Sequence, residues 1–208
     1  DEQVGEIVDK LKEIGKYDNT LIIFTSDNGP THVEQVDINF FNSAGIFVNS
    51  KKTVKGSVNE GGIRVPTIVT WPKKIKSGTK SDHPSTFYDF FATVSDIVGN
   101  PLYIKTDGLS YLPSLIGKDQ KEHDYLYWEF TGYGGQQAIR INQWKGIKRD
   151  LFKGPSNLKL YDLSKDPKEI NDVANLYPDV VDNMEKLLNQ AHTKATIKTF
   201  NIPILDQK

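Results

Sequence analysis

Two adjacent side chains, Asp27 and Asn28, offer oxygen atoms that could bind a metal ion. They follow the apolar run 21–24 and precede Gly29-Pro30, a pair that ends regular structure. A carboxylate beside an amide carbonyl is a partial shell for a hard cation such as Ca2+ or Mg2+. Asp-Asn-Gly is also a common turn sequence, so the tripeptide alone leaves both a metal site and a simple turn open. His32 lies a few residues further on, and it is either a site residue or an ordinary exposed histidine.

A second polar segment opens with Lys55 and has the pattern K-G-x-x-x-E-G-G-x-R-x-P over residues 55–66. Gly61 and Gly62 permit close backbone approach, and backbone N–H groups together with lysine and arginine favour an anion. The segment is not a P-loop, because its lysine precedes the glycines. Lys55 is therefore a candidate anion ligand, against the alternative of a solvated surface lysine.

The elements that must position these residues have the pattern of an α/β protein. An amphipathic helix is predicted over residues 2–15 and a strand over 21–24, buried on both faces as parallel strands are. Helix, short link and strand form half of a βαβ unit, which implies a preceding parallel strand. Residues 31–50 are expected to form a long loop with a short strand near 46–48, and residues 65–71 another buried strand.

The end of the chain is predicted to form a smaller layer. Short strands are expected over residues 124–130, 136–141, 144–149 and 158–163, as an antiparallel meander with a hairpin at Asn142-Gln143. The apolar stripe of the helix after Pro178 would cover one face of this sheet. Trp128 and Glu129 are substrate-binding candidates, since aromatic faces and carboxylates grip sugar rings; the alternative is a buried tryptophan beside a paired carboxylate.

Composition narrows the class of protein. The formal net charge of -1 gives no reason to propose a nucleic acid partner, and 37% hydrophobic with 25% charged residues is ordinary for a globular chain. No apolar run approaches the roughly 20 residues needed to span a bilayer. There is no cysteine, which excludes disulfides and a cysteine nucleophile within these residues.

Read together, the motifs resemble the later half of the sulfatases, the arylsulfatase-like branch of the alkaline phosphatase superfamily. S-D-N-G-P at 26–30 and K-G-x-x-x-E-G-G-x-R-x-P at 55–66 are followed in order by several further matches. These are the stretch 85–94 with Gly99, D-G-L-S-Y-L-P-S-L-I-G at 107–117, Y-W-E-F at 127–130, A-I-R at 138–140 with W-K at 144–145, and L-Y-D-L-S-K-D-P-K-E at 160–169.

The resemblance implies both fold and chemistry. Residues 1–113 would be the C-terminal part of an alkaline-phosphatase-like α/β sandwich, and residues 114–208 a small antiparallel sheet packed with a C-terminal helix. Asp27 and Asn28 would help bind a divalent cation, usually Ca2+ (or Mg2+), and Lys55 would contact the sulfate group. Glu60 and Arg64 are expected to hold their loop as an ion pair or through hydrogen bonds.

Other expectations follow from the family. His32 would contact substrate, although it stands one place later than the corresponding histidine in many relatives. Trp128 and Glu129 would inherit a substrate role, although Thr131 replaces a histidine that follows W-E-F in many relatives. The partner would be a sulfated small molecule or glycan, and the compartment periplasmic, secreted or lysosomal.

The chain departs from the family pattern in two essential respects. Sulfatases depend on an early C-x-P-x-R or S-x-P-x-R motif, whose Cys or Ser becomes the formylglycine nucleophile, and on an early acidic pair that completes the metal shell. Neither occurs here. We therefore expect the C-terminal portion of a sulfatase, inactive by itself, with the missing N-terminal portion of the same protein as a partner. Two alternatives remain: a phosphomonoester or phosphonate hydrolase of the same superfamily, and a non-catalytic carbohydrate-binding or interaction module.

Overall fold

The computed structural model describes residues 1–32, 37–100, 102 and 104–206. The contacts divide the chain into two compact units, one of residues 1–25 and 66–123 and one of residues 26–65 and 124–208. The loop 26–65 thus belongs with the C-terminal residues, whereas the predicted domains 1–113 and 114–208 stay a prediction. No helix of the described residues is both long and apolar enough to cross a membrane.

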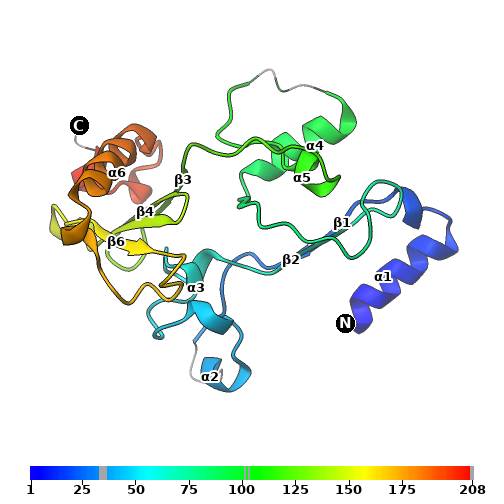
Figure 1. Ribbon diagram of the computed structural model, residues 1–208, viewed down its shortest axis with the longest axis horizontal. Coiled ribbons are helices and arrows are strands. Elements are labelled where there is room, and N and C mark those ends of the chain that lie inside the picture. The colour runs from blue at the N-terminus through cyan, green and yellow to red at the C-terminus, as the bar shows by residue number, and fades with distance from the viewer. Residues whose placement is uncertain (33–36, 101, 103, 207–208) are drawn as a thin grey trace. The chain divides into compact units, whose positions relative to one another are not determined.

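The first unit contains helix α1 (Glu2–Glu13), a 3-10 turn η1 (Tyr17–Asn19), the strands β1 (Ile22–Thr25) and β2 (Thr67–Thr70), and the helices α4 (Asp89–Val98) and α5 (Leu112–Leu115) (Figure 1). Helix α1 ends as predicted, with Gly15 in a left-handed conformation at φ 66°. Strand β1 pairs with β2 in antiparallel fashion, with Ile23 opposite Val69. The implied parallel neighbour of β1 stays a prediction.

The two-stranded sheet is not covered on both faces by the described residues. Phe24 of β1 is 52% exposed and Ile68 of β2 is 64% exposed. The expectation of a strand buried on both faces is therefore wrong for this unit as described. The physical reason is that the apolar side chains of the described helices are themselves exposed: α1 has no buried residue, and Phe90 and Phe91 of α4 are 48% and 54% exposed.

Polar contacts hold the start of α4. The carboxylate of Asp89, fully buried, accepts hydrogen bonds from the backbone N–H groups of Thr86 at 2.7 Å and Leu109 at 2.9 Å. The ring Nε2 of His123 lies 2.8 Å from the same carboxylate. Gly108 has to be glycine, because a Cβ there would lie 2.1 Å from the carbonyl oxygen of Tyr88.

The second unit is built on a four-stranded antiparallel sheet in the order β3-β4-β5-β6 (Leu126–Phe130, Gln136–Ile141, Trp144–Arg149 and Lys159–Asp162). All four strands lie where the alternating pattern predicted them, and Asn142 turns the hairpin at φ 52°. Its remaining elements are α2 (Ile38–Phe41), η2 (Gly45–Phe47), α3 (Glu60–Ile63), η3 (Leu151–Lys153), η4 (Ala174–Leu176), α6 (Pro178–Ala191), η5 (Lys198–Phe200) and α7 (Pro203–Asp206).

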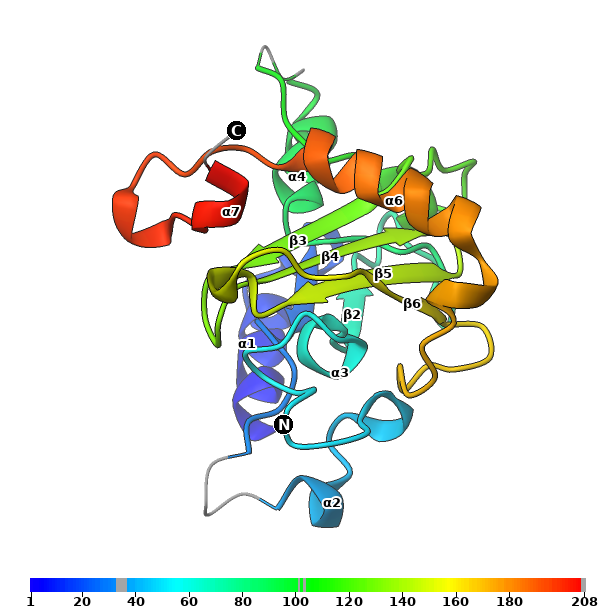
Figure 2. The ribbon, with the colours of Figure 1, turned by 90° about the vertical axis from the view of Figure 1, so that its left-hand side faces the viewer.

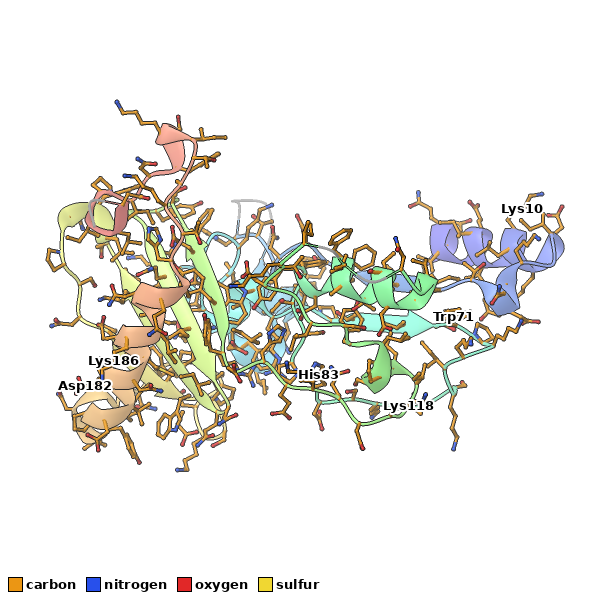
Figure 3. All side chains as sticks on the ribbon, turned by 90° about the horizontal axis from the view of Figure 1, so that it is seen from above. Lys10, Trp71, His83, Lys118, Asp182 and Lys186 are labelled. Carbon is orange, nitrogen blue, oxygen red and sulfur yellow. The ribbon has the colours of Figure 1, made fainter. Side chains whose placement is uncertain are left out.

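Different elements cover the two faces of this sheet. Helix α6 lies across one face and the segment containing α3 lies against the other (Figure 2). On the α6 side the core consists of Ile139, Leu158, Leu160, Met184 and Leu188. Asp182 and Lys186 point away from the sheet on the outer side of the helix (Figure 3), as an amphipathic stripe requires.

The predicted strand near residues 46–48 is wrong. Gly45 adopts φ 52°, and the N–H of Phe47 donates to the carbonyl of Ala44 at 3.1 Å, which makes a 3-10 turn. A left-handed residue directly before an apolar triplet turns the chain out of the extended conformation that a strand needs. Within the predicted loop 31–50, residues 33–36 lie outside the described residues.

Candidate functional site

The loop after β1 presents two oxygen-bearing side chains. Asp27 is exposed, and its carboxylate accepts no hydrogen bond from the described residues. The side-chain Nδ2 of Asn28 donates to the carbonyl of Gly29 at 2.9 Å, and Ser26 Oγ donates to the carbonyl of Asn28 at 2.9 Å. Because the amide nitrogen is engaged by backbone, Oδ1 of Asn28 is the atom left to accept a cation or a donor.

The structure brings this loop together with the segment that Lys55 opens. The N–H of Gly29 donates to the carbonyl of Gly62 at 2.8 Å, and the N–H of Lys55 donates to the carbonyl of Pro30 at 3.0 Å. A Cβ on Gly29 would lie 1.9 Å from the carbonyl oxygen of Gly61, so only glycine allows this approach. Two motifs separated by a long loop are thus joined through backbone alone, and the Lys55 side chain remains exposed.

A buried ionic cluster holds residues 55–66, which we call the glycine segment. Lys145 of β5, fully buried, places Nζ 2.7 Å from Oε1 of Glu60 and 3.1 Å from Oε1 of Glu169. The other oxygen of Glu169 accepts from the N–H of Glu60 at 2.8 Å and from Nδ2 of Asn59 at 2.7 Å. Glu169 therefore caps the first turn of α3, directly before Gly61 and Gly62.

The expected ion pair of Glu60 and Arg64 is present, with Arg64 Nη1 3.4 Å from Oε2 of Glu60. Burial by itself would raise the pKa of Glu60, but the charge and hydrogen bond of Lys145, with Arg140 and Arg64 nearby, lower the pKa below its usual 4.5. The carboxylate is thus ionised at neutral pH although it is buried. We refer to Glu60, Lys145 and Glu169 as the ionic cluster.

Trp128 and Glu129 lie on opposite faces of the sheet, as neighbours in a strand must. Trp128 packs against the cluster of Val58, Ala138, Ile147 and Tyr161. Glu129 Oε2 accepts a hydrogen bond from the Tyr127 hydroxyl and lies 2.8 Å from Nδ1 of His192. The described structure therefore does not bring these two side chains to one surface, and their substrate roles stay predictions.

The hydroxyl of Tyr127 is partly buried beside Glu129 and takes part in a hydrogen-bond network on this face of the sheet. Burial, followed by its hydrogen bond to Glu129, strongly raises the pKa of the Tyr127 hydroxyl, so this group stays protonated. Gln137 donates to the same hydroxyl at 2.8 Å. Beyond Nδ1, the second ring nitrogen of His192 lies 3.5 Å from Oδ1 of Asp206. These contacts tie the C-terminal residues to the sheet.

His32 is exposed, and no contact of its side chain with a described residue decides its role. The sequence did not single out Tyr133, which is 77% exposed with φ 52° and whose ring lies against Gly56, the residue after Lys55. The only available signal was the Gly-rich loop that contains it. No local pattern pairs Lys145 with a carboxylate, because Glu60 and Glu169 lie far from it along the chain.

The residues present fit half of a cation site. The carboxylate of Asp27 and Oδ1 of Asn28 are hard oxygen donors free to coordinate, whereas Ca2+ prefers roughly 6 to 8 oxygens. No group of three or more histidine or acidic side chains with metal-binding geometry exists within the described ranges. Further ligands would therefore have to come from outside these residues.

Comparison with known families agrees with this geometry. A model of the sulfatases matches residues 1–100, and a model described as N-sulphoglucosamine sulphohydrolase, C-terminal, matches residues 54–194. The chain belongs to the sulfatase family. The second model spans the glycine segment, the ionic cluster and the four-stranded sheet of this sulfatase chain, and the first model spans Asp27, Asn28 and Lys55.

Individual relatives give the same result. The chain is 33% identical to an N-acetylgalactosamine-6-O-sulfatase of Bacteroides thetaiotaomicron over 92% of its length and 40% of that protein. A solved B. thetaiotaomicron sulfatase structure from a study of glycosaminoglycan metabolism aligns with a TM-score of 0.72 at 32% identity, covering 90% of this chain and 42% of the other.

A third relative has a different named activity. The phosphonate monoester hydrolase of Agrobacterium radiobacter aligns with a TM-score of 0.66 at 27% identity, covering 89% of this chain and 38% of that one. The chain thus spans about 40% of the length of each of these three relatives.

Proposed function

We propose that this chain supplies half of the cation site and the anion-binding lysine of a sulfuric ester hydrolase. The observation that carries the proposal is the pair of backbone hydrogen bonds from Gly29 to Gly62 and from Lys55 to Pro30. They hold the Asp27-Asn28 loop against the segment that presents Lys55. A cation and an ammonium group both suit an anionic group on which further negative charge develops, such as a sulfate ester during cleavage.

The roles of the residues follow from their chemistry. Lys55, exposed and without a carboxylate partner among the described residues, would bind the sulfuryl oxygens and stabilise the charge that develops on them. Asp27 and Asn28 would hold the cation, which acts as a Lewis acid when bound. The nucleophile, a formylglycine in this family, would have to come from residues outside these 208, so we propose that the chain alone does not turn over substrate.

The first experiment substitutes Asp27 and Lys55 separately by alanine in the complete protein. Lys55→Ala should lower kcat for a sulfate ester by roughly 10² or more, as loss of other preorganised charge stabilisers does. Asp27→Ala should weaken Ca2+ binding, measured by calorimetry, as well as turnover. Lys51→Ala, which removes an exposed lysine of the same loop, is the matched control and should retain activity. Normal kinetics in Lys55→Ala would remove this lysine from the mechanism.

For the substrate we propose a sulfated carbohydrate, with an aryl sulfate as the simpler candidate. The support is the similarity to an enzyme named N-acetylgalactosamine-6-O-sulfatase. A panel of sulfated hexosamines that differ only in the sulfated position would test this with the complete protein. Cleavage of aryl sulfates alone would contradict the carbohydrate assignment.

A phosphonate or phosphate monoester hydrolase is the second candidate, and the similarity to the Agrobacterium phosphonate monoester hydrolase supports it. Phosphonate and sulfate monoesters both place negative charge on oxygens around a tetrahedral centre, so the same lysine and cation would serve either. The ratio of kcat/KM for a sulfate ester and its phosphonate counterpart decides between the two activities.

The exposed apolar side chains of the first unit suit a missing partner. Phe24, Ile68, Phe90 and Phe91 each have about half or more of their surface exposed. We propose that the N-terminal portion of the same protein covers them, since exposed apolar area of this extent marks an interaction surface. A non-catalytic carbohydrate-binding module is the remaining alternative, and it predicts glycan binding that neither a chelator nor Asp27→Ala disturbs.

A further inference from the structure

An exposed aromatic side chain lies over the residue that follows the candidate anion-binding lysine. Tyr133 leaves 77% of its surface to solvent, and its ring lies over Gly56, the residue that follows Lys55. A Cβ on Gly56 would lie 2.4 Å from Cε2 of the tyrosine ring, so glycine is required for this approach. The tyrosine packs on backbone and does not enter either core cluster of the unit.

The loop that carries Tyr133 is held rigidly to the loop of Lys55. Gln136, which is buried, donates from Nε2 to the carbonyl of Gly56 at 2.9 Å and to that of Gly132 at 3.4 Å. Its Oε1 accepts from the N–H of Val58 at 3.5 Å. One buried amide therefore joins the loop that carries Tyr133 to the loop that carries Lys55.

Tyr133 has an unfavourable backbone conformation, although its side chain is largely exposed. Its φ of 52° lies in the left-handed region, which is unfavourable for a bulky side chain by roughly 1 kcal/mol or more. A glycine at position 133 would adopt the same φ without strain. A second aromatic ring, that of Phe130, has its centroid 6.4 Å from the tyrosine ring and is also partly exposed.

We infer that Tyr133 is the aromatic platform against which the sugar ring of the substrate stacks while its sulfate group is bound by Lys55. The inference rests on the proposed function and names the ring-binding part of that site. A pyranose presents an apolar C–H face and a rim of hydroxyl groups, and a tyrosine offers both an apolar ring and a polar tip. Gln136 is the positioning residue that holds the platform beside the lysine.

The test compares two sulfate esters in the complete protein: a sulfated hexosamine and a simple alkyl sulfate with no ring. Tyr133→Ala should raise KM for the sugar about five- to tenfold, as expected for one lost aromatic contact, and leave the alkyl sulfate kinetics unchanged. Tyr133→Phe should behave like the wild type. Tyr133→Gly removes the ring while relieving the backbone strain, and it should match the alanine variant. Phe200→Ala, which removes another exposed aromatic ring of this unit, is the control.

Two outcomes would overturn the inference. In one, folded Tyr133→Ala and Tyr133→Gly variants keep the wild-type KM for the sugar. In the other, they lose activity equally on both esters, which would make the ring a structural contact. Failure of the proposed function is distinguishable, because then the wild-type protein would cleave neither ester. Titration of the wild type and Tyr133→Ala with the sulfated hexosamine would still compare their affinities for the sugar, and equal affinities would overturn the platform.

Discussion

The two faces of the four-stranded sheet are held by different forces. The core under α6 is aliphatic, with Leu160 and Met184 fully buried, and the hydrogen bond of Tyr127 to Glu129 lies beside it. The opposite face carries Lys145, which reaches two carboxylates of the loop segments packed against it. Both faces carry polar contacts, since Glu129 pairs with His192 and Lys148 with Glu185 on the α6 face, but the fully buried Lys145 lies on the opposite face.

The difference between the faces matches the elements packed on them, a helix on one face and the glycine segment on the other. Burial of apolar area stabilises a helix in many slightly different positions, because the hydrophobic effect has no direction. A buried ion pair contributes little net stability after desolvation but is severely weakened when its geometry changes. We interpret the ionic cluster as the contact that gives the glycine segment one position, and with it the Asp27 loop and Lys55.

The largest expected effect comes from Lys145→Met. This substitution keeps the length of the side chain but leaves Glu60 and Glu169 buried without their cation, which should lower the free energy of unfolding by about 3–5 kcal/mol. Hydrogen exchange at the N–H groups of Gly29 and Lys55 should accelerate, because the glycine segment takes part in both hydrogen bonds and loses its anchor.

The matched control is Lys148→Met on the same strand. Lys148 pairs with Glu185 of α6 at 2.9 Å, and both side chains are partly exposed, so the loss should be about 0.2–1 kcal/mol. Equal losses in the two variants, or unchanged exchange in Lys145→Met, would contradict the assigned role of the ionic cluster.

Leu160→Ala should be nearly as destabilising and yet leave the site intact. The side chain is fully buried against α6, and such truncations cost about 2–5 kcal/mol. Urea unfolding measures the loss, and calorimetry below the unfolding transition should give the wild-type Ca2+ affinity. If the affinity fell along with stability, the two faces would not be separable.

The smallest expected effect is the dependence of the free energy of unfolding on pH in the acid range. The pKa of Glu60 is lowered in the folded state, so its ionised form contributes stability that is complete above pH 4.5 and is lost as the pH falls through the lowered folded value. Glu60→Gln should flatten this part of the stability curve, with a loss of about 1–3 kcal/mol at neutral pH. Urea midpoints measured across the acid range check this, with Glu185→Gln as the control; an unchanged acid slope would exclude Glu60 as its source.

Local patterns predicted most of the fold. The strands β3 to β6 and the hairpin at Asn142 follow from alternation and turn chemistry, which act over a few residues. The apolar stripe of α6 predicted its buried side for the same reason. The error at Gly45–Phe47 arose because apolar character alone does not distinguish a strand from a 3-10 turn.

The site was predicted only in part. Family motifs named Asp27, Asn28 and Lys55, and the paired backbone bonds put their segments together. Lys145 and its two carboxylates could not be paired from sequence, because nothing local marks a buried lysine. Trp128 and Glu129 were chosen as candidates for their chemistry, whereas strand alternation sends adjacent side chains to opposite faces.

The hydrogen bond from the N–H of Glu60 to Glu169 also determines when the glycine segment can be capped during synthesis. The two residues are 109 positions apart, so the glycine segment leaves the ribosome long before its cap exists. At synthesis rates of about 5–20 residues per second, roughly 5 to 20 seconds separate the synthesis of Glu60 from that of Glu169. Completion of the site is therefore a late event in synthesis, and a chain truncated before residue 169 would keep every residue of the D-N-G and K-G motifs while lacking the cap that orders them.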